Sequence, residues 1–524
     1  MKMWKNNRKI CDICVICERK NCNFAPFLIL KMAISFYHIL GLVLSILLIE
    51  VVGIMSVRRV KNENDFNTGG GRAGTWVVTG TIIGTLVGGQ STVGTAQLAF
   101  SFGISAWWFT MGMALGCVVL AIGYVIPLRR SGSTTLLEIV RKEYGRKAEM
   151  TGSVLCSLGM FISIIAQVLS ASALLMTLFN IPFWACAILS AIIMTLYVVF
   201  GGLWSAGIGG VVKIILLCLS ALAAGAVVLA LSKGYSGLMD AINHVLLNTD
   251  VQSVDGMNTI QDVNHKYQNI FARGVSKDVG SCLSVILGVL STQTYAQAIW
   301  SGRSDSVARK GAMISALISI PIGFACVMVG MYMRANYITA YELDALMAIG
   351  KDIPAGLGVM TSSAQAFPMF VTNHLPKFLG GIVLGTLLIT IIIGGSGLTL
   401  GASTILVKDV FKPNNKLLIS RFTIVGIQLV AVVVAASFSG RYINDLGFLS
   451  MGLRTTATFV PLTLALFYPG RFKPKWVFLS IIFGTACLIA GEFVSLPVDS
   501  IYFGLIGSLS CCLIGLKYEK RIRK

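Results

Sequence analysis

Two kinds of residue in this sequence could do chemistry: cysteines near the N-terminus, and a few charged or polar side chains within long apolar runs. The cysteine pattern is C-x2-C-x2-C-x4-C, formed by Cys11, Cys14, Cys17 and Cys22. Thiolates at such a spacing can hold zinc or an iron–sulfur cluster. The surrounding segment is short and basic, and Met32 follows it. The competing interpretation is that residues 1–31 are a non-native or disordered extension upstream of the true start.

Two charges, Lys213 and Arg454, lie inside apolar runs. A charge at that depth costs about 3 kcal/mol on insertion scales, so it tends to be functional. The guanidinium of Arg454 is planar and suits a carboxylate, which predicts binding of an anionic group of a small molecule. The alternative is a structural pairing of Arg454 with Glu50 or with backbone carbonyls.

Long apolar runs must position these side chains. Apolar residues make up 55% of the 524-residue chain and charged residues 12%. Runs of about 20 apolar residues match the roughly 30 Å of hydrocarbon in a bilayer, so we expect an all-α polytopic membrane protein. About thirteen spans are predicted, at residues 33–56, 75–101, 105–127, 149–179, 183–201, 209–232, 278–300, 312–334, 378–405, 420–440, 444–468, 474–494 and 498–516.

The net charge of +20 could suggest a nucleic-acid partner, but the basic residues gather in alternate loops and in the tail 517–524. The positive-inside rule explains this pattern and places those loops in the cytoplasm. We therefore expect a multi-pass protein of the plasma (cytoplasmic) membrane, with its N-terminus outside and its C-terminus inside. We expect lipid and a small solute as partners, no nucleic acid, and a chain that can act as a monomer.

The run 75–109 carries no charge, and its middle, Val87–Gly94, is rich in glycine and polar residues. A helix broken there frees backbone groups within the membrane, and a bound solute or ion can satisfy them. This feature predicts a transporter. The residues expected to bind the solute are Gln90, Ser91, Gln167, Tyr295, Gln297 and Arg454. The spans show no nucleophile–base pair or metal cluster, so we expect neither an enzyme nor a cofactor. The chain has no P-loop pattern, which argues against ATP-driven transport.

The ordered motifs of the chain resemble those of the sodium:solute symporter family. The resemblance rests on Asp65-Phe66, the glycine-rich break, Gly103-Ile-Ser-Ala-Trp107-Trp108, Thr134-Thr-Leu-Leu-Glu138, Phe200-Gly-Gly-Leu-Trp204, Tyr295-Ala-Gln297 and Ser396-Gly-Leu-Thr399. It implies two inverted five-helix repeats, 75–232 and 278–468, each opening with a broken helix. Segments 33–56 and 474–516 would be peripheral helices, and 233–277 an extracellular loop.

The chain departs from that family where the resemblance would place a sodium ion. The family's Ser-Thr pair falls on Ile393 and Gly394, and its Asp falls on Gly210. A Gln that often follows the Asp falls on Lys213. The predicted ion-site region therefore consists of Val87, Gly88, Gly210, Lys213, Ile393 and Gly394. In one interpretation Lys213 places its charge in the vacated site, and transport is sodium-independent or coupled to protons. In the other, Lys213 lies one or two turns inside span 209–232 and reaches the cytoplasmic surface.

Together these features predict a secondary active transporter, a symporter of a small organic solute for which an anion is one candidate. It would work by alternating access, with sodium as the coupling ion by family default. The alternatives are coupling to protons, sodium independence with Lys213 in place of the ion, or a transporter-like solute sensor.

Overall fold

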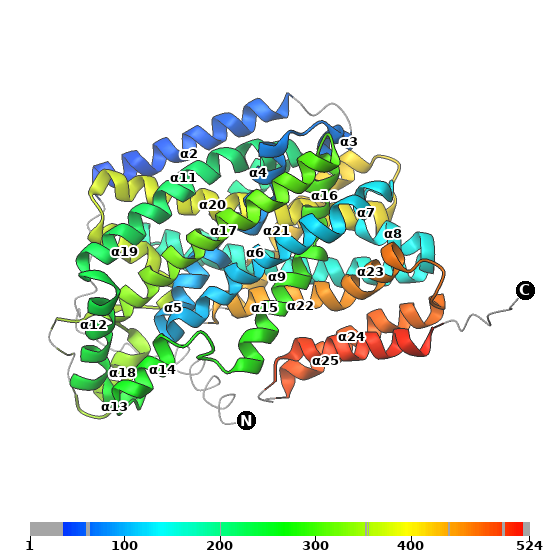
Figure 1. The fold of residues 1–524 in the computed structure, drawn as a ribbon. Coiled ribbons are helices and arrows are strands. Elements are labelled where there is room, and N and C mark those ends of the chain that lie inside the picture. Colours follow the sequence, from blue (N-terminus) through cyan, green and yellow to red (C-terminus); the bar gives the residue numbers. More distant parts are fainter. Residues whose placement is uncertain are drawn as a thin grey trace, which may run out of the picture. The chain divides into compact units, whose positions relative to one another are not determined.

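The computed structural model describes residues 35–58, 63–199, 201–351, 354, 356–438, 441–494 and 498–516, and helices make up nearly all of them (Figure 1). The predicted cysteine cluster at Cys11–Cys22 and the basic tail 517–524 lie outside the described residues. The side chain of Glu50, considered as a partner for Arg454, lies outside them as well.

Helices of the first half follow the predicted apolar runs closely. They are α2 (Phe36–Val57), α3 (Glu63–Thr68), α4 (Thr75–Leu86), α5 (Thr95–Phe102), α6 (Trp108–Val119), α7 (Val125–Arg130), α8 (Leu136–Tyr144), α9 (Arg146–Phe179), α10 (Phe183–Val199) and α11 (Gly202–Leu231). The loop predicted at 233–277 carries α12 (Gly234–Asn248), α13 (Gln252–Asp255) and α14 (Ile260–Tyr267).

The second half repeats this alternation of long helices and short connections. Its helices are α15 (Val275–Leu290), α16 (Gln293–Ser301), α17 (Asp305–Arg334), α18 (Ala340–Ala348), α19 (Ala366–His374), α20 (Lys377–Ile405), α21 (Lys416–Ala435), α22 (Ile443–Arg454), α23 (Val460–Phe467), α24 (Pro474–Phe493) and α25 (Ser500–Ile514). Between α17 and α19, the strands β1 (Tyr337–Thr339) and β2 (Gly358–Met360) pair in parallel, with Ile338 opposite Val359.

Seven helical runs in the described part of the chain are long and apolar enough to cross a membrane, or eight if α15 and α16, bent by 45°, form one span. Four shorter apolar helices add to them: Phe36–Leu48, Thr75–Leu86, Phe183–Val199 and Ser500–Ile514. Each predicted span overlaps a helix of the structure. The number that crosses the membrane stays a prediction.

One boundary differs from the prediction in a way that matters for function. Helix α11 begins at Gly202 rather than at residue 209, so Lys213 lies deep in the helix and its side chain is fully buried. The interpretation that Lys213 reaches the cytoplasmic surface is therefore wrong. After α10 the chain turns at Gly202, whose φ is 51°, and α11 begins there. The residues at the start of α11 pack against Phe66 and α4.

Glycines let α4 and α11 cross at close range. A Cβ atom on Gly210 would lie 2.0 Å from the carbonyl oxygen of Gly80, and one on Gly80 would lie 2.3 Å from the carbonyl oxygen of Gly207. Such small residues allow backbone contact between membrane helices. This crossing brings the middle of α11 against the end of α4, where the first helix is interrupted.

Candidate functional site

The first interruption lies where the sequence predicted it. Helix α4 ends at Leu86, Val87 is extended (φ −86°, ψ 94°), and a π-helical turn, Gln90–Gly94, leads into α5. The backbone N–H of Gly89 donates to Oε1 of Gln167 at 2.7 Å. The hydroxyls of Ser91 and Thr92 both donate to the carbonyl oxygen of Gly88, at 3.0 Å each. Side chains of the protein thus satisfy part of the backbone that the break frees.

Lys213 contacts more of that backbone. Its Nζ donates to the carbonyl oxygens of Gly84 at 2.8 Å, Thr390 at 3.2 Å and Ile83 at 3.4 Å, and also to the carbonyl oxygen of Val87. Three of these oxygens belong to the end of α4 and the fourth to α20. The ion-site region predicted from the sequence is therefore brought together around an ammonium group.

The neighbouring positions of that region add no side-chain oxygen. Ile393 and Gly394 lie on α20 against the break: a Cβ on Gly84 would lie 3.3 Å from Cγ2 of Ile393, and one on Gly394 would lie 3.2 Å from Cα of Gly88. Gly210 faces the backbone of α4 at contact distance. The cation ligands present here are thus backbone carbonyls.

Arg454, the second buried charge, binds a set of hydroxyl groups. Its guanidinium donates to Oγ1 of Thr292 at 2.7 Å, to Oγ of Ser450 at 2.9 Å and to Oγ of Ser163 at 3.1 Å. Its Nε donates to the carbonyl oxygen of Ser450 at 3.1 Å. No salt bridge within the described part of the chain includes Arg454, so a fully buried cation has only neutral partners there.

This network, which we call the Arg454 network (Gln90, Ser163, Thr292, Ser450 and Arg454), connects the two helix breaks. Nε2 of Gln90, in the first break, donates to Oγ of Ser163 on α9 at 3.4 Å. Thr292 lies in the second break, between α15 and α16. The oxygen atoms of Ser163 and Ser450 are 2.8 Å apart. Polar groups from α9, α22 and both breaks therefore converge, and all of them are buried.

Two residues predicted to bind the solute, Tyr295 and Gln297, lie on α16. Tyr295 is buried on α16, one turn after Thr292. Gln297 lies further along α16, where its Nε2 donates to Oγ1 of Thr404 at 3.1 Å. Oγ1 of Thr404 in turn donates to Asn67. Gln297 is therefore bonded outside the Arg454 network.

Sequence reasoning missed Ser163, Thr292 and Ser450. Ser163 precedes Gln167 by four residues and Ser450 precedes Arg454 by four, so each pair shares a helix face. That spacing was a usable signal, although a lone serine in a membrane helix more often bonds to its own backbone, as Ser170 does to the carbonyl oxygen of Ala166.

A second polar cluster closes the end of the helices at which the loops are basic. Oγ1 of Thr135 donates to Oδ1 of Asp409 at 2.8 Å, and Oγ of Ser153 donates to Oδ2 of Asp409 at 3.2 Å. Nearby, the buried carboxylate of Glu149 pairs with Arg146 and lies 3.6 Å from Nζ of Lys412. These contacts join α8, α9 and the turn that follows α20.

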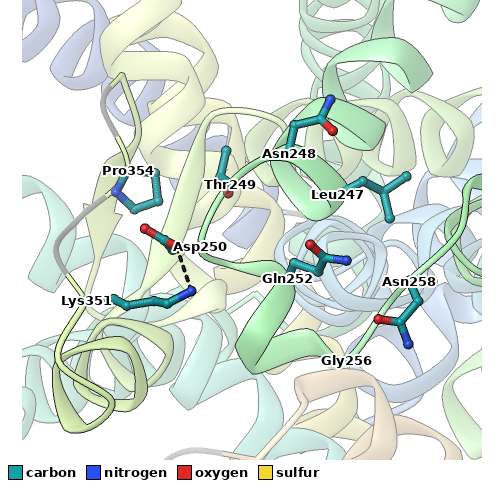
Figure 2. A pocket seen from close by; sticks show the side chains of 9 residues that line it. All are labelled: Leu247, Asn248, Thr249, Asp250, Gln252, Gly256, Asn258, Lys351 and Pro354. Atoms are coloured by element: carbon teal, nitrogen blue, oxygen red, sulfur yellow. Dashed lines mark ion pairs between the residues drawn. The ribbon is translucent and has the colours of Figure 1, made fainter.

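One cavity lies elsewhere, among the connecting helices. Its volume is about 780 Å³, and Figure 2 shows its lining from α12, α13 and the segment after α18, with Lys351 and Asp250 paired at 2.8 Å. None of the residues predicted to bind solute lines it. The Arg454 network is therefore the better candidate site, and its side chains are buried.

Two interrupted helices, joined at their breaks by buried polar side chains, define a class: the multi-pass membrane proteins with the broken-helix architecture of secondary transporters. The chain belongs to the sodium:solute symporter family, whose sequence profile (SSF) matches residues 66–484. The sequence prediction of this family is confirmed. The family consists of transporters rather than enzymes.

Individual relatives are distant. A high-affinity choline transporter 1 from Drosophila melanogaster is 22% identical over 76% of this chain, and the match spans 61% of that relative's length. A sodium/glucose cotransporter from Vibrio parahaemolyticus is 20% identical over 87% of this chain, and the match spans 84% of the length of that cotransporter. The superposition on a solved structure of a Na⁺-coupled sialic acid symporter covers 92% of this chain and 97% of the symporter chain, with 16% sequence identity and a TM-score of 0.69. It confirms the predicted transporter fold.

Proposed function

We propose that this protein is a symporter that moves a small organic anion across the plasma membrane by alternating access. The carrying observation is the guanidinium of Arg454: it is fully buried, unpaired with any carboxylate among the described residues, and bonded to hydroxyls at both helix breaks. A cation in such a site attracts a carboxylate strongly, because charge-assisted bidentate hydrogen bonds are roughly twice as strong as neutral ones.

The hydroxyl partners fit this role. The hydroxyl oxygens of Thr292, Ser163 and Ser450 accept hydrogen bonds from the guanidinium, while the hydroxyls of Thr292 and Ser450 donate to the carbonyl oxygens of Gly288 and Gly159. A carboxylate would take the place of these neutral acceptors on the guanidinium. Since Thr292 lies in the second break and Gln90 in the first, a solute at Arg454 would contact both interrupted helices. Movement of these helices relative to each other would then open the site to one side or the other.

The coupling ion follows the family by default. The Vibrio relative is a sodium/glucose cotransporter and the sialic acid symporter is Na⁺-coupled. We propose that sodium is also the ion that drives transport in this protein. The alternative is a proton, or no coupling ion. The orientation, with a cytoplasmic C-terminus and a basic cytoplasmic side, comes from the charge of the loops and belongs to the same proposal.

Uptake into proteoliposomes tests the solute and the ion together. The purified protein is given sodium or proton gradients against amino acids, carboxylates and sugars, and each carboxylate is paired with its amide. We expect a carboxylate to be taken up and its amide to be refused. Uptake of amides or neutral sugars in place of carboxylates contradicts the anion assignment.

Two variants locate the binding group. Arg454→Gln removes the buried charge and should lower the affinity for the carboxylate at least tenfold, since a hydrogen bond to a charged group contributes about 1.5–3 kcal/mol. Arg441→Gln makes the same chemical change at an exposed position and should transport like the unmodified protein. Equal affinities in the two variants would show that Arg454 is structural.

A further inference from the structure

The end of helix α4 is a place where a free cation would be expected to bind. The helix stops at Leu86, so no continuing helix supplies an N–H partner to the carbonyls of Gly84 and Val87, whereas the carbonyl of Ile83 still accepts from the N–H of Val87 at 3.0 Å. The negative end of the helix dipole lies at the same point. Carbonyl oxygens with this arrangement replace the hydration shell of a monovalent cation.

The Nζ atom of Lys213 already occupies this place. It contacts the carbonyl oxygens of Ile83, Gly84 and Val87 on one side and that of Thr390 on the other. We call these four oxygens the carbonyl cage. An ammonium group carries the charge of a monovalent ion, and its three N–H donors are shared among the four oxygens, so it suits the cage in electrostatics and in hydrogen bonding.

Among the described residues, the charge of Lys213 has no acidic counterpart. No salt bridge in the described ranges involves it, and its side chain is 0% exposed. The carbonyl dipoles are therefore what stabilises the charge. Conversely, without the ammonium the carbonyl oxygens of Gly84 and Val87, beyond which the helix does not continue, would lose this partner, which costs about 1–3 kcal/mol for each group left unsatisfied.

Helix packing holds the ammonium in place. The Gly80–Gly210 crossing brings the backbones of α4 and α11 into contact one turn before Lys213, so the lysine stem needs only to span the gap to the cage. Thr390 contributes its carbonyl and also has a buried hydroxyl without a hydrogen-bond partner among the described residues.

We propose that the carbonyl cage is a cation site filled permanently by the chain's own Lys213, and that this position binds no free ion. Removal of the lysine side chain opens the cage to an external monovalent cation. The proposal refines the ion half of the proposed function, but it concerns a site that can be tested without any solute.

The test is thermal stability of the full-length protein in detergent, in choline, sodium or n-propylammonium chloride at equal ionic strength. n-Propylammonium carries the atoms that Lys213→Ala removes. We expect Lys213→Ala to melt at a lower temperature than the unmodified protein in choline and to regain most of the loss in sodium or n-propylammonium. The control Lys310→Ala, an exposed lysine on α17, should show no such difference from the unmodified protein.

A second variant separates the charge from the filled space. Lys213→Met keeps the length of the side chain without the ammonium, so it should be destabilised and should not respond to added cations. The proposal is overturned if Lys213→Met is as stable as the unmodified protein. It is also overturned if Lys213→Ala melts at one temperature in all three salts, or gives no folded protein in any of them.

The outcome is independent of the uptake experiment. If no carboxylate is transported, the anion assignment fails while the cation response of Lys213→Ala still stands or falls by itself. If that response is missing while carboxylate uptake is normal, the resident-cation proposal fails alone.

Discussion

Adding one methyl group at the crossing of α4 and α11 tests the packing that places Lys213 in its cage. In Gly210→Ala the new Cβ would lie 2.0 Å from the carbonyl oxygen of Gly80. A carbon–oxygen contact normally needs about 3.3 Å, so the helices must separate by about 1.3 Å. The obstacle is backbone in the interior of α4, which cannot rotate away as a side chain can.

The expected cost follows from two opposing effects. Overpacking costs about 1–3 kcal/mol, and a clash with backbone belongs at the upper end of that range. Alanine regains about 1 kcal/mol because it favours a helix more than glycine does. We expect a net destabilisation of about 2 kcal/mol. The separation should also lengthen the 2.8 Å contact between Lys213 and Gly84, so carboxylate uptake should fall together with stability.

The assay is the fraction of full-length protein that stays monodisperse after heating, with Gly225→Ala as the matched control. Gly225 lies on the same helix, and its added Cβ would meet Cβ of Ala325 at an ordinary 3.6 Å. The control should therefore be unchanged or more stable. If Gly210→Ala withstands heating as well as Gly225→Ala does, the close crossing is not what fixes these helices.

Two further predictions concern groups outside the central site. Glu149→Gln removes the carboxylate that pairs with Arg146 and lies near Lys412. The variant should lose about 1–2 kcal/mol of stability, after allowance for solvent screening of the half-exposed cations. Its difference from the unmodified protein on heating should shrink at high salt, and equal stability of the two proteins at low salt would contradict the reasoning. His374, on α19 outside the predicted spans, packs against the ring of Tyr332, and burial lowers the pKa of its imidazole below the ordinary value. The unfolded chain then binds the proton more readily than the folded protein, so stability should fall as the pH drops below about 6.5. Between pH 8 and pH 5 the melting temperature should fall further for the unmodified protein than for His374→Phe. Parallel curves of melting temperature against pH would refute this.

The apolar runs and the first break were predictable because membrane helices have a strong signal in length and composition. The interruption at Val87 was visible in its glycines and polar residues, and the structure places it there. The buried charges Lys213 and Arg454 stood out for the same reason, since few ionisable groups lie at such depth.

The partners of those charges could not be predicted. Lys213 binds backbone carbonyls, which every residue has, so no side-chain pattern marked Ile83 or Thr390 as its contacts. Helix α11 extends seven residues further toward the N-terminus than the span predicted at 209–232, because the length of an apolar run does not show that its glycines let α11 pack closely on α4. The hydrogen bond from Gln297 to Thr404 was not predictable either, because sequence alone does not show which way α16 turns its faces.

A cation that belongs to the chain never crosses the membrane. A sodium ion that moves down a potential of 100 mV releases about 2.3 kcal/mol, whereas an ammonium anchored in α11 releases nothing in a full cycle. With Lys213 in the carbonyl cage, this position supports the architecture without contributing driving force. Accumulation of solute against its gradient must then draw on an ion bound elsewhere in the protein or on the charge of the solute itself.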